Sequence, residues 1–467
     1  MWKIGSISLK YKLPLIIVGF SLISSVILQF AVYQAYKERS IAGIESEFNS
    51  VATARREMML EWFDTLSTEV RLQASAPGTI DAVVELGSAY RALRDDATSV
   101  LQDAYITNNP KPAGERQNLK RAPEDTQYNI AHGEYHPYFL DVQQQLGLYD
   151  VFLFDHQGSV VYSVFKEDDF AQNFISGPYA DSGLGEAWKL AGGLAKGEVR
   201  MVDIAPYAPS NGAPASFIIS PVVSPDGRVL GALAFQVPLE AMQAQIDLAN
   251  GLGETGDVFL VGSDMRMRSH SRFEGRFEVL DTAAPSPHID ALFGGTEGFF
   301  ANTKLQDGED GFAYVLKVQG PGVDWGIVLE RDTHEVLAPL RSFLIRMVMI
   351  LAVVSAVVLA LGILIARSIT NPIVRLSDTV QSISAGSLSI TVAEAARQDE
   401  LGLIGKALEG LREKLLFAET LKAEREERQA EQQRVVQALS DGLQQLAAGD
   451  LTQALRTPFD AEYEALR

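Results

Sequence analysis

Two uncharged apolar runs constrain the fold of this chain more than any other feature of its sequence. Residues 13–33 form a first run of about 21 residues, and residues 347–366 form a second of about 20. Helices of that length cross about 30 Å of hydrocarbon. The first run is too long for a signal-peptide core, and no small-residue cleavage site follows it. We therefore expect two transmembrane helices, both retained.

Basic residues near the N-terminus predict the orientation of these helices. Lys3, Lys10 and Lys12 precede the first run with no acidic residue among them. Positively charged flanks stay in the cytoplasm, so we expect a cytoplasmic tail over residues 1–12 and a cytoplasmic C-terminal part. Residues 34–346 would then lie outside the cytoplasm, between the two spans of a multi-pass membrane protein.

Composition excludes several classes of function. The net charge of −20 argues against binding to a phosphate backbone, so we expect no nucleic-acid partner. The chain has no cysteine, which excludes disulfides, thiolate metal sites and a cysteine nucleophile. The six histidines are scattered, and no Ser/His/Asp set can be assembled from their spacing. We expect no enzyme activity, no cofactor and no metal.

Two motifs imitate functional sites. Residues 251–256 match GxGxxG, but they follow a predicted helix and precede a predicted strand, the reverse of a dinucleotide site. A turn is the expected structure there. His132 and His136 have the spacing of a helical zinc pair, yet Gly133 and Pro137 argue against a helix. We interpret both histidines as loop residues.

The segment between the two apolar runs is predicted to form a helix followed by two strand-rich modules. Residues 34–103 favour a helix, and residues 108–129, which contain three prolines, favour a loop. Hairpins are then predicted within residues 149–165, around Gly158, and within residues 215–237. A similar order recurs, with a helix over residues 239–248, a strand over 257–261 and a strand pair over 311–318 and 325–330. The recurrence predicts two similar α+β modules in tandem.

Two segments give this pattern a family resemblance. GRVLGALAFQVPLEAM and GETGDVFLVGSDMRMRSHSRF resemble the double Cache ectodomains of bacterial methyl-accepting chemotaxis receptors, and the likeness extends over residues 36–340. The resemblance implies a PAS-like antiparallel sheet with flanking helices in each module. It also implies a location in the bacterial inner membrane, with this domain in the periplasm. It places a distal module at about residues 104–238 and a proximal module at about 239–335, with the small-molecule ligand in the distal one.

The resemblance also bears on the ligand. Amino-acid-sensing members carry a Tyr-x-Asp where this chain has Tyr207 and Pro209, and a further Asp near Gln236. Their Arg-x-Trp pair is missing near residues 178–188. We therefore expect a ligand less cationic than an amino acid, or else a solute-binding protein. Aromatic walls with a few polar groups suit such sites, and the candidate pocket residues are Tyr162, Phe165, Tyr179, Trp188, Asp203 and Tyr207. Ordinary core roles, and for Asp203 a structural salt bridge, are the alternatives.

After the second apolar run the sequence becomes heptad. Apolar residues recur at 4-3-4-3 spacing within 369–383 and at 3-4-3-4 spacing within 401–415. Gly386 breaks the first helix, and an acidic Asp-Glu-Leu-Gly at 399–402 starts the second. Neither stripe has an evident partner within one chain, so a parallel homodimer with a four-helix bundle is expected. These features resemble the HAMP module over residues 367–418 and imply signal conversion at Pro372, Gly386 and Glu400.

The C-terminal residues resemble the start of another such unit. A charged helical linker over 419–434 leads to residues 435–467, where Gly449-Asp450-Leu451 repeats the earlier break and Phe459 to Leu466 suggest a further helix. No chemoreceptor hairpin, kinase or cyclase domain follows, so we expect the output domain to be missing.

The favoured function is that of a transmembrane chemoreceptor, whose contact with a chemotaxis adaptor and kinase would need the missing domain. The sensor half of a membrane histidine kinase or nucleotide cyclase, and a receptor that only binds, stay open as alternatives.

Overall fold

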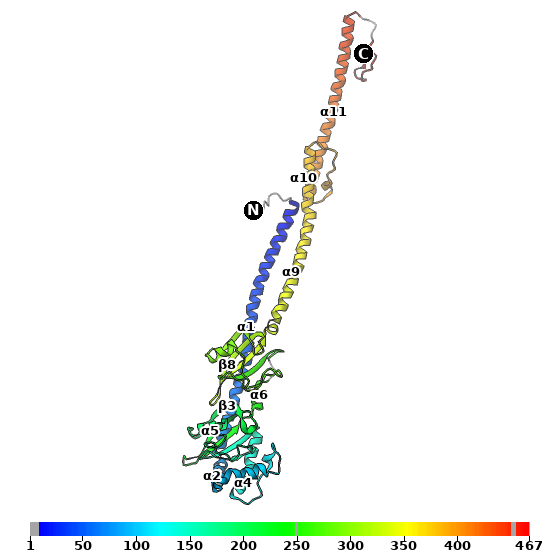
Figure 1. The fold of residues 1–467 in the computed structure, drawn as a ribbon. Coiled ribbons are helices and arrows are strands. Elements are labelled where there is room, and N and C mark those ends of the chain that lie inside the picture. The colour runs from blue at the N-terminus through cyan, green and yellow to red at the C-terminus, as the bar shows by residue number, and fades with distance from the viewer. Residues whose placement is uncertain (1–8, 248–250, 450–453, 467) are drawn as a thin grey trace. The chain divides into compact units, whose positions relative to one another are not determined.

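The computed structural model describes residues 9–247, 251–449 and 454–466. The chain divides into two compact units. One is the sensor unit, Gln34–Phe343, and the other is the membrane unit, formed by Met1–Tyr33 together with Leu344–Arg467. Each unit is described separately, and Figure 1 labels the elements.

Helices form the first layer of the sensor unit. α1 (Leu9–Ser75) enters this unit at Gln34, and its buried side chains Phe48, Met59 and Phe63 lie in the main hydrophobic core. α2 (Pro77–Ala92) follows after a single residue, with a proline in its first turn, where a missing N–H costs no hydrogen bond. α3 (Ala97–Gln102) ends in a π-helical turn, Asp103–Thr107. The predicted long helix is thus interrupted at Ala76 and again after Ala92.

A helix that the sequence analysis missed follows the proline-containing loop. α4 (Gln127–Leu146) begins at Thr126, whose side chain accepts a hydrogen bond from the Asn129 N–H, and ends at Gly147 with φ +62°. His132 and His136 lie on its buried face, so the loop assignment of both histidines is wrong. Pro137 removes one backbone donor from the helix. Burial of the face that also carries Phe139 compensates for that loss.

The distal module is a five-stranded antiparallel sheet, in agreement with the expected hairpins. Its strand order is β2-β1-β5-β4-β3. One face packs with α1, α2 and α4 in the main core, and α5 (Gly183–Ala191) packs on the other face against Phe152, Phe154 and Phe217. The strands are β1 (Asp150–Asp155), β2 (Val160–Ser163), β3 (Arg200–Tyr207), β4 (Ala213–Val223) and β5 (Val229–Gln236).

The proximal module repeats this plan with a four-stranded antiparallel sheet of order β6-β9-β8-β7. Met267 forms an isolated antiparallel bridge with Val261 of β6. This bridge occupies the place in the proximal module that β2 occupies beside β1 in the distal one. Figure 1 places α2 and α4 at one end of the sensor unit and β8 towards the other. The elements are α6 (Leu239–Ile246), β6 (Asp257–Gly262), α7 (Pro287–Phe293), β7 (Gly298–Lys304), β8 (Asp310–Gln319), β9 (Asp324–Asp332) and α8 (Thr333–Val336).

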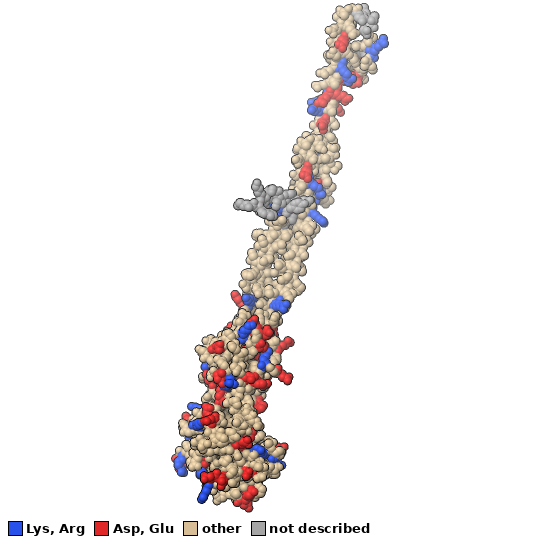
Figure 2. Space-filling model, viewed as in Figure 1, with Lys and Arg blue, Asp and Glu red and all other residues tan. Residues whose placement is uncertain are grey.

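The membrane unit contains two helices long and apolar enough to cross a membrane. They are the N-terminal part of α1 and α9 (Ala338–Ile365), which continues through a π-helical turn, Ala366–Thr370. Gln29 Nε2 donates a hydrogen bond to the carbonyl of Met347, so a polar side chain of one span is satisfied by the other span. Figure 2 shows a surface without charged side chains over most of the length of these segments.

Beyond the π-helical turn, α10 (Asn371–Ser384) and α11 (Glu400–Ala447) are joined by an extended connector. Leu376, Ile383 and Leu408 are buried with Val392 of that connector. The expectation that neither stripe has a partner within one chain is therefore wrong for these positions, because the connector folds over them. Leu401 is half-buried against the same cluster. The remaining positions of the two stripes are exposed in the single chain: Ile369, Ile373, Val380, Ile404, Leu411 and Leu415.

The charged linker and the last stripe form the C-terminal half of α11, which ends before Gly449 with φ +88°. Asp450 and Leu451 lie outside the described residues. The further helix expected from Phe459 onward is limited to one 3₁₀ turn, Glu464–Leu466, in the part that the structure describes.

Candidate ligand site

Four polar side chains gather at one end of the distal sheet, on the face that carries α5. We call Asp150, Asp169, Tyr207 and Gln236 the distal acceptor cluster. Asp150 and Gln236 are register partners on β1 and β5, and Gln236 also pairs with Phe217 of β4. Directly opposed residues in a sheet have neighbouring side chains. Tyr207 packs edge-to-face on Phe217, with ring centroids 4.9 Å apart, which brings the end of β3 to the same place.

Asp169 reaches this cluster from the loop after β2. Tyr207 Oη donates to Asp169 Oδ2 at 2.6 Å. Asp150 Oδ1 accepts hydrogen bonds from the backbone N–H groups of Val151, Val164 and Phe165 at 2.6, 2.8 and 3.0 Å. These bonds attach the start of the loop after β2 to β1. The cluster is therefore built from four separate segments by hydrogen bonds and strand register.

Each of three acceptors in the cluster has one buried oxygen without a hydrogen-bond partner. These are Asp150 Oδ2, Asp169 Oδ1 and Gln236 Oε1. Burial, together with the charge of Asp169, raises the pKa of Asp150 well above its usual range. Burial likewise raises the pKa of Asp169 to about 7. Buried carboxylates without donors are costly, so this arrangement favours a bound group that supplies hydrogen-bond donors or positive charge.

The buried cation Lys166 does not donate a hydrogen bond to any of these three oxygens. Lys166 is fully buried and has φ +57°, and its Nζ donates to the carbonyls of Ser163 and Val164 at 2.9 and 3.3 Å. It lies 5.1 Å from the ring centroid of Tyr162 and faces Tyr105 and Phe170 as well. Burial lowers the pKa of Lys166 to about 7, an effect that the Asp150 carboxylate opposes. Two hydrogen bonds of the Lys166 ammonium group are thus made to carbonyl oxygens, and its charge acts on Asp150 only through space.

The six residues proposed from the sequence fall in different places. Tyr207 belongs to the distal acceptor cluster, and Tyr179 and Trp188 pack against the same hydrophobic cluster under α5, where Trp188 stacks on Phe154. Phe165 stacks on Tyr149, with ring centroids 5.1 Å apart. Tyr162 lies in the main core on the helical side, where its hydroxyl contacts His136 Nδ1 at 2.7 Å.

Asp203 forms a structural salt bridge, which the sequence analysis gave as the alternative to a place in the ligand pocket. Its carboxylate accepts from Arg268 Nε at 2.7 Å, from Arg268 Nη2 at 2.8 Å and from Trp325 Nε1 at 2.9 Å. Both donors belong to the proximal module. Nearby, the Met201 N–H donates to the Pro321 carbonyl at 2.7 Å. Strand β3 therefore carries a residue of the distal acceptor cluster at its end, and its middle is bonded to the proximal module.

Sequence reasoning missed Asp150 and Asp169 and considered Gln236 only as a departure from a family pattern. Asp150 precedes the apolar Val-Phe-Leu-Phe run, which is the one signal that could have shown it to be buried. Asp169 lies in Lys-Glu-Asp-Asp, which reads as an exposed charged loop. Its burial depends on the hydroxyl of Tyr207, which is distant in sequence.

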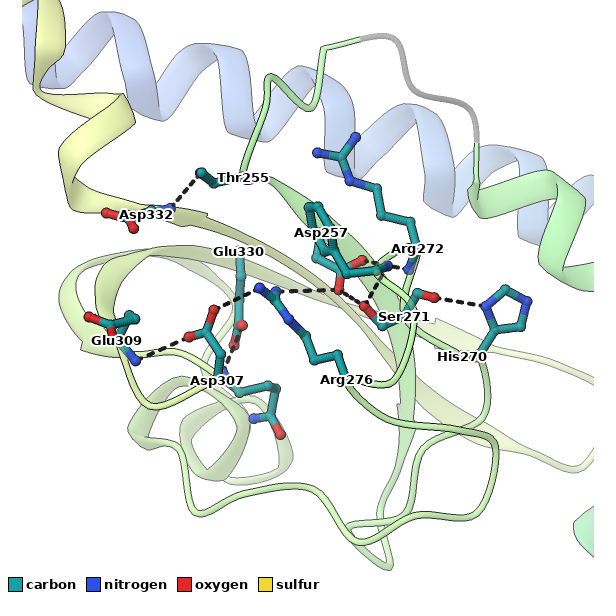
Figure 3. A network of polar contacts seen from close by, with 12 residues as sticks. Thr255, Asp257, His270, Ser271, Arg272, Arg276, Asp307, Glu309, Glu330 and Asp332 are labelled. Atoms are coloured by element: carbon teal, nitrogen blue, oxygen red, sulfur yellow. Dashed lines mark hydrogen bonds and ion pairs between the residues drawn. The ribbon is translucent and has the colours of Figure 1, made fainter.

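The proximal module has a counterpart of the cluster, shown in Figure 3. Asp257, the first residue of β6, pairs in register with Glu330 of β9, as Asp150 pairs with Gln236. Here the acceptors are occupied by the module's own donors. Arg276 reaches Asp257 at 3.7 Å and Asp307 at 2.8 Å. Ser271 Oγ donates to Asp257 at 2.5 Å.

Glu330 is satisfied in the same way. One of its oxygens lies 2.8 Å from His288 Nε2, and the other accepts from the Gln306 N–H at 2.9 Å. The equivalent site in the proximal module is thus filled by a guanidinium and an imidazole of the chain itself. Of the two modules, the distal one is left with unpaired acceptors at this position.

The paired histidines of α4 do not form a metal site with their neighbours. His136 Nε2 contacts the Gln117 carbonyl at 2.7 Å, and His132 Nδ1 contacts the Lys120 carbonyl at 2.9 Å. Burial lowers the pKa of His136 to about 3 and that of His132 well below its usual range. Within the described ranges no group of three or more His, Cys, Asp or Glu residues is placed to hold a metal ion.

The helix–connector–helix segment of the membrane unit can be identified from its sequence. Residues 364–416 match the HAMP domain family. This segment is a HAMP domain. The family resemblance drawn from the glycine break and the acidic restart is confirmed.

Known proteins resemble the chain over a larger part of its length. A probable chemoreceptor of Sinorhizobium fredii is 23% identical over 452 residues, covering 91% of this chain and 56% of the relative. The chain therefore spans about half the length of that homologue.

Two solved structures resemble the chain as well. The ligand-binding domain of the Pseudomonas aeruginosa amino acid chemoreceptor PctB, in complex with L-Arg, shows 14% identity and a TM-score of 0.38, covering 64% of this chain and 92% of that one. The sensor domain of the Vibrio cholerae histidine kinase DctB shows 12% identity and a TM-score of 0.36, covering 64% and 98%.

The three residues predicted to take part in signal conversion lie at helix boundaries of the HAMP domain. Pro372 lies in the first turn of α10 and is buried. Gly386 ends that helix with φ +86°, and its N–H donates to the Ile383 carbonyl at 3.0 Å. Glu400 is the first residue of α11, directly after Asp399, whose carboxylate caps the helix by accepting from the Gly402 N–H at 3.1 Å. The helix dipole favours negative charge at the N-terminus of a helix, so Asp399 and Glu400 stabilise the start of α11.

Proposed function

We propose that this chain is a transmembrane chemoreceptor that binds a small molecule in a periplasmic sensor unit and transmits the signal through its HAMP domain. The observation that carries the proposal is the set of unpaired, buried acceptors in the distal module of a chain that also contains a HAMP domain. The similarity to a probable chemoreceptor over most of the chain supports the same function.

The chemistry of the distal acceptor cluster defines the class of ligand. Three buried oxygens without donors would bind an ammonium or guanidinium group, since charge-assisted hydrogen bonds compensate best for buried carboxylates. The Arg276 guanidinium at the equivalent proximal site is an internal example of such a group. This preference is opposite to the less cationic ligand that Pro209 and Gln236 had suggested, because Asp150 and Asp169 were not part of that argument.

Transmission would depend on a second copy of the chain. The exposed part of the HAMP stripe, such as Ile373, Val380 and Leu411, is apolar and would be covered in a parallel dimer. The lysines of the N-terminal tail support a cytoplasmic location for the HAMP domain and a periplasmic one for the sensor unit. A ligand that binds one packing arrangement of the dimer better than another would shift their populations.

The test uses the full chain in lipid nanodiscs and measures thermal stabilisation by agmatine, putrescine and succinate. A ligand that binds the native state raises the melting temperature in proportion to RT ln(1 + [L]/Kd). We expect at least one of the two cations to stabilise the protein and succinate to have no effect. Stabilisation by succinate alone would contradict the proposed ligand class.

Matched variants locate the site. Asp150→Asn and Asp169→Asn should each abolish the shift produced by the cation. Asp168→Asn, which changes the exposed neighbour of Asp169, should retain it. A shift that survives in both cluster variants would place the ligand elsewhere.

A further inference from the structure

A cavity lies between the two modules of the sensor unit. Its volume is about 440 Å³, within the range typical of small-molecule sites. The distal module contributes Tyr149, Pro214 and Gln236 to its wall, and the proximal module contributes His270 and Val279. Helix α6, which connects the modules, lines it with Glu240 and Met242. This junction cavity shares Gln236 with the distal acceptor cluster, but Asp150, Asp169 and Tyr207 are not among its lining residues, so it adjoins the site proposed above and extends from it towards the proximal module.

The polar groups of the junction cavity include several acceptors, whereas the hydroxyl groups of Tyr149 and Ser210 already donate to Glu167. Gln236 is 3% exposed and its Oε1 has no hydrogen-bond partner. Glu240 and Glu278 add two exposed carboxylates. His270 is held in place, with Nδ1 at 2.9 Å from the Ser271 carbonyl and its backbone N–H bonded to Gln243 of α6. None of the described lining residues is Lys or Arg.

The remaining wall is apolar and includes Pro214, Val237, Leu239, Met242 and Val279. A cavity with an apolar wall, a buried unpaired amide oxygen and two carboxylates suits a molecule that joins an apolar body to a cationic nitrogen. We propose that the junction cavity is a second binding site of the sensor unit, and that it takes a small amphipathic organic amine.

Occupation of this cavity would join the two modules through the ligand. Its wall combines the ends of distal strands with a proximal loop, and α6 is tied to that loop by hydrogen bonds of 3.1 and 3.2 Å between Gln243 and His270. A molecule in contact with both sides stabilises the arrangement of modules to which it binds. The second site would thus modulate how the distal module acts on the proximal one.

The test measures phenethylamine binding to the full chain in nanodiscs by isothermal titration calorimetry, with phenethyl alcohol as the neutral comparison. Loss of the charge-assisted contacts is expected to weaken binding about tenfold for the alcohol, and by a similar factor for the Glu240→Gln/Glu278→Gln variant. Glu274→Gln, an exposed change in the same loop and outside the cavity, should bind phenethylamine as the wild type does.

One further variant decides the location. Val279→Trp fills the cavity and should abolish binding, and the glutamine variant, whose changes are both exposed, covers the case in which the tryptophan variant fails to fold. Absence of wild-type binding, unchanged affinity in the glutamine variant, or unchanged affinity in a folded Val279→Trp variant would each overturn the proposal.

Discussion

Replacement of Asp203 should loosen the attachment of the distal module to the proximal one. The Arg268 side chain is 3% exposed, whereas that of Asp203 is 41% exposed. The Asp203 carboxylate is the bidentate acceptor for that arginine and also the acceptor for Trp325 Nε1. Asp203→Ala removes all three bonds and leaves a buried guanidinium with Asp264, at 2.8 Å, as its remaining carboxylate.

The size of the effect follows from these exposures. Removing one partner of a fully buried ion pair costs about 3–5 kcal/mol, and exposed pairs contribute about 0–1 kcal/mol. Asp203 is partly solvated and Asp264 compensates in part, so we expect a loss of about 2 kcal/mol. The unfolding entropy is about 2.1 cal/mol/K per residue, so in a unit that extends from Gln34 to Phe343 this loss corresponds to a decrease of roughly 3 °C in melting temperature.

The assay is thermal unfolding of the full chain, combined with a double-mutant cycle between Asp203→Ala and Arg268→Met. We expect a coupling energy of at least about 1 kcal/mol, because the two side chains share two hydrogen bonds. Asp226→Ala removes an ion pair whose carboxylate side chain is 59% exposed and should change stability little. Additive effects of the two substitutions, or equal effects of Asp203→Ala and Asp226→Ala, would refute the reasoning.

Three other predictions follow from the site and the HAMP domain. Because the pKa of Asp169 is raised to about 7, its protonated form stabilises the fold below about pH 4 and this contribution is lost as the pH rises to about 7. Melting temperatures across that interval should therefore fall more steeply for the wild type than for Asp169→Asn. Because the pKa of Lys166 is lowered to about 7, its titration changes the stability of the fold only at pH values above that interval. Gly386→Ala meets no atom within 4 Å but forces a side chain to φ +86°, at a cost of about 1 kcal/mol. In a chimera with a known output domain it should shift the basal output and leave ligand affinity unchanged, and normal switching would count against this role. Ile373→Cys should form disulfide-linked dimers in membranes far faster than Asp378→Cys, and equal rates would argue against the proposed dimer.

Local patterns in the sequence predicted the elements whose formation depends on neighbouring residues. The apolar runs, the hairpins around Gly158 and Gly227, and the HAMP helices interrupted at Gly386 all follow from periodicity and turn chemistry within about ten residues. The turn at 251–256 was predicted for the same reason. In each case hydrophobic spacing and a residue that tolerates positive φ act along one short segment.

Elements stabilised by distant residues were not predictable in this way. α4 contains Gly133 and Pro137, and its helix forms because its face with His132, His136 and Phe139 is buried against the distal sheet and the loop before it. β7 includes Gly298 and Asn302, two residues with positive φ, so its sequence lacks a clear strand pattern. Pairing with β8 decides its conformation.

The sequence by itself determined that this chain has two apolar spans, a tandem strand-rich segment between them and a HAMP domain after the second span. Only the tertiary structure decided which polar residues meet. Asp150, Asp169, Tyr207 and Gln236 come from different segments, and Asp203 finds its partner in the other module. Whether a carboxylate lacks a donor depends on the folded arrangement of distant side chains, and no local spacing contains that information.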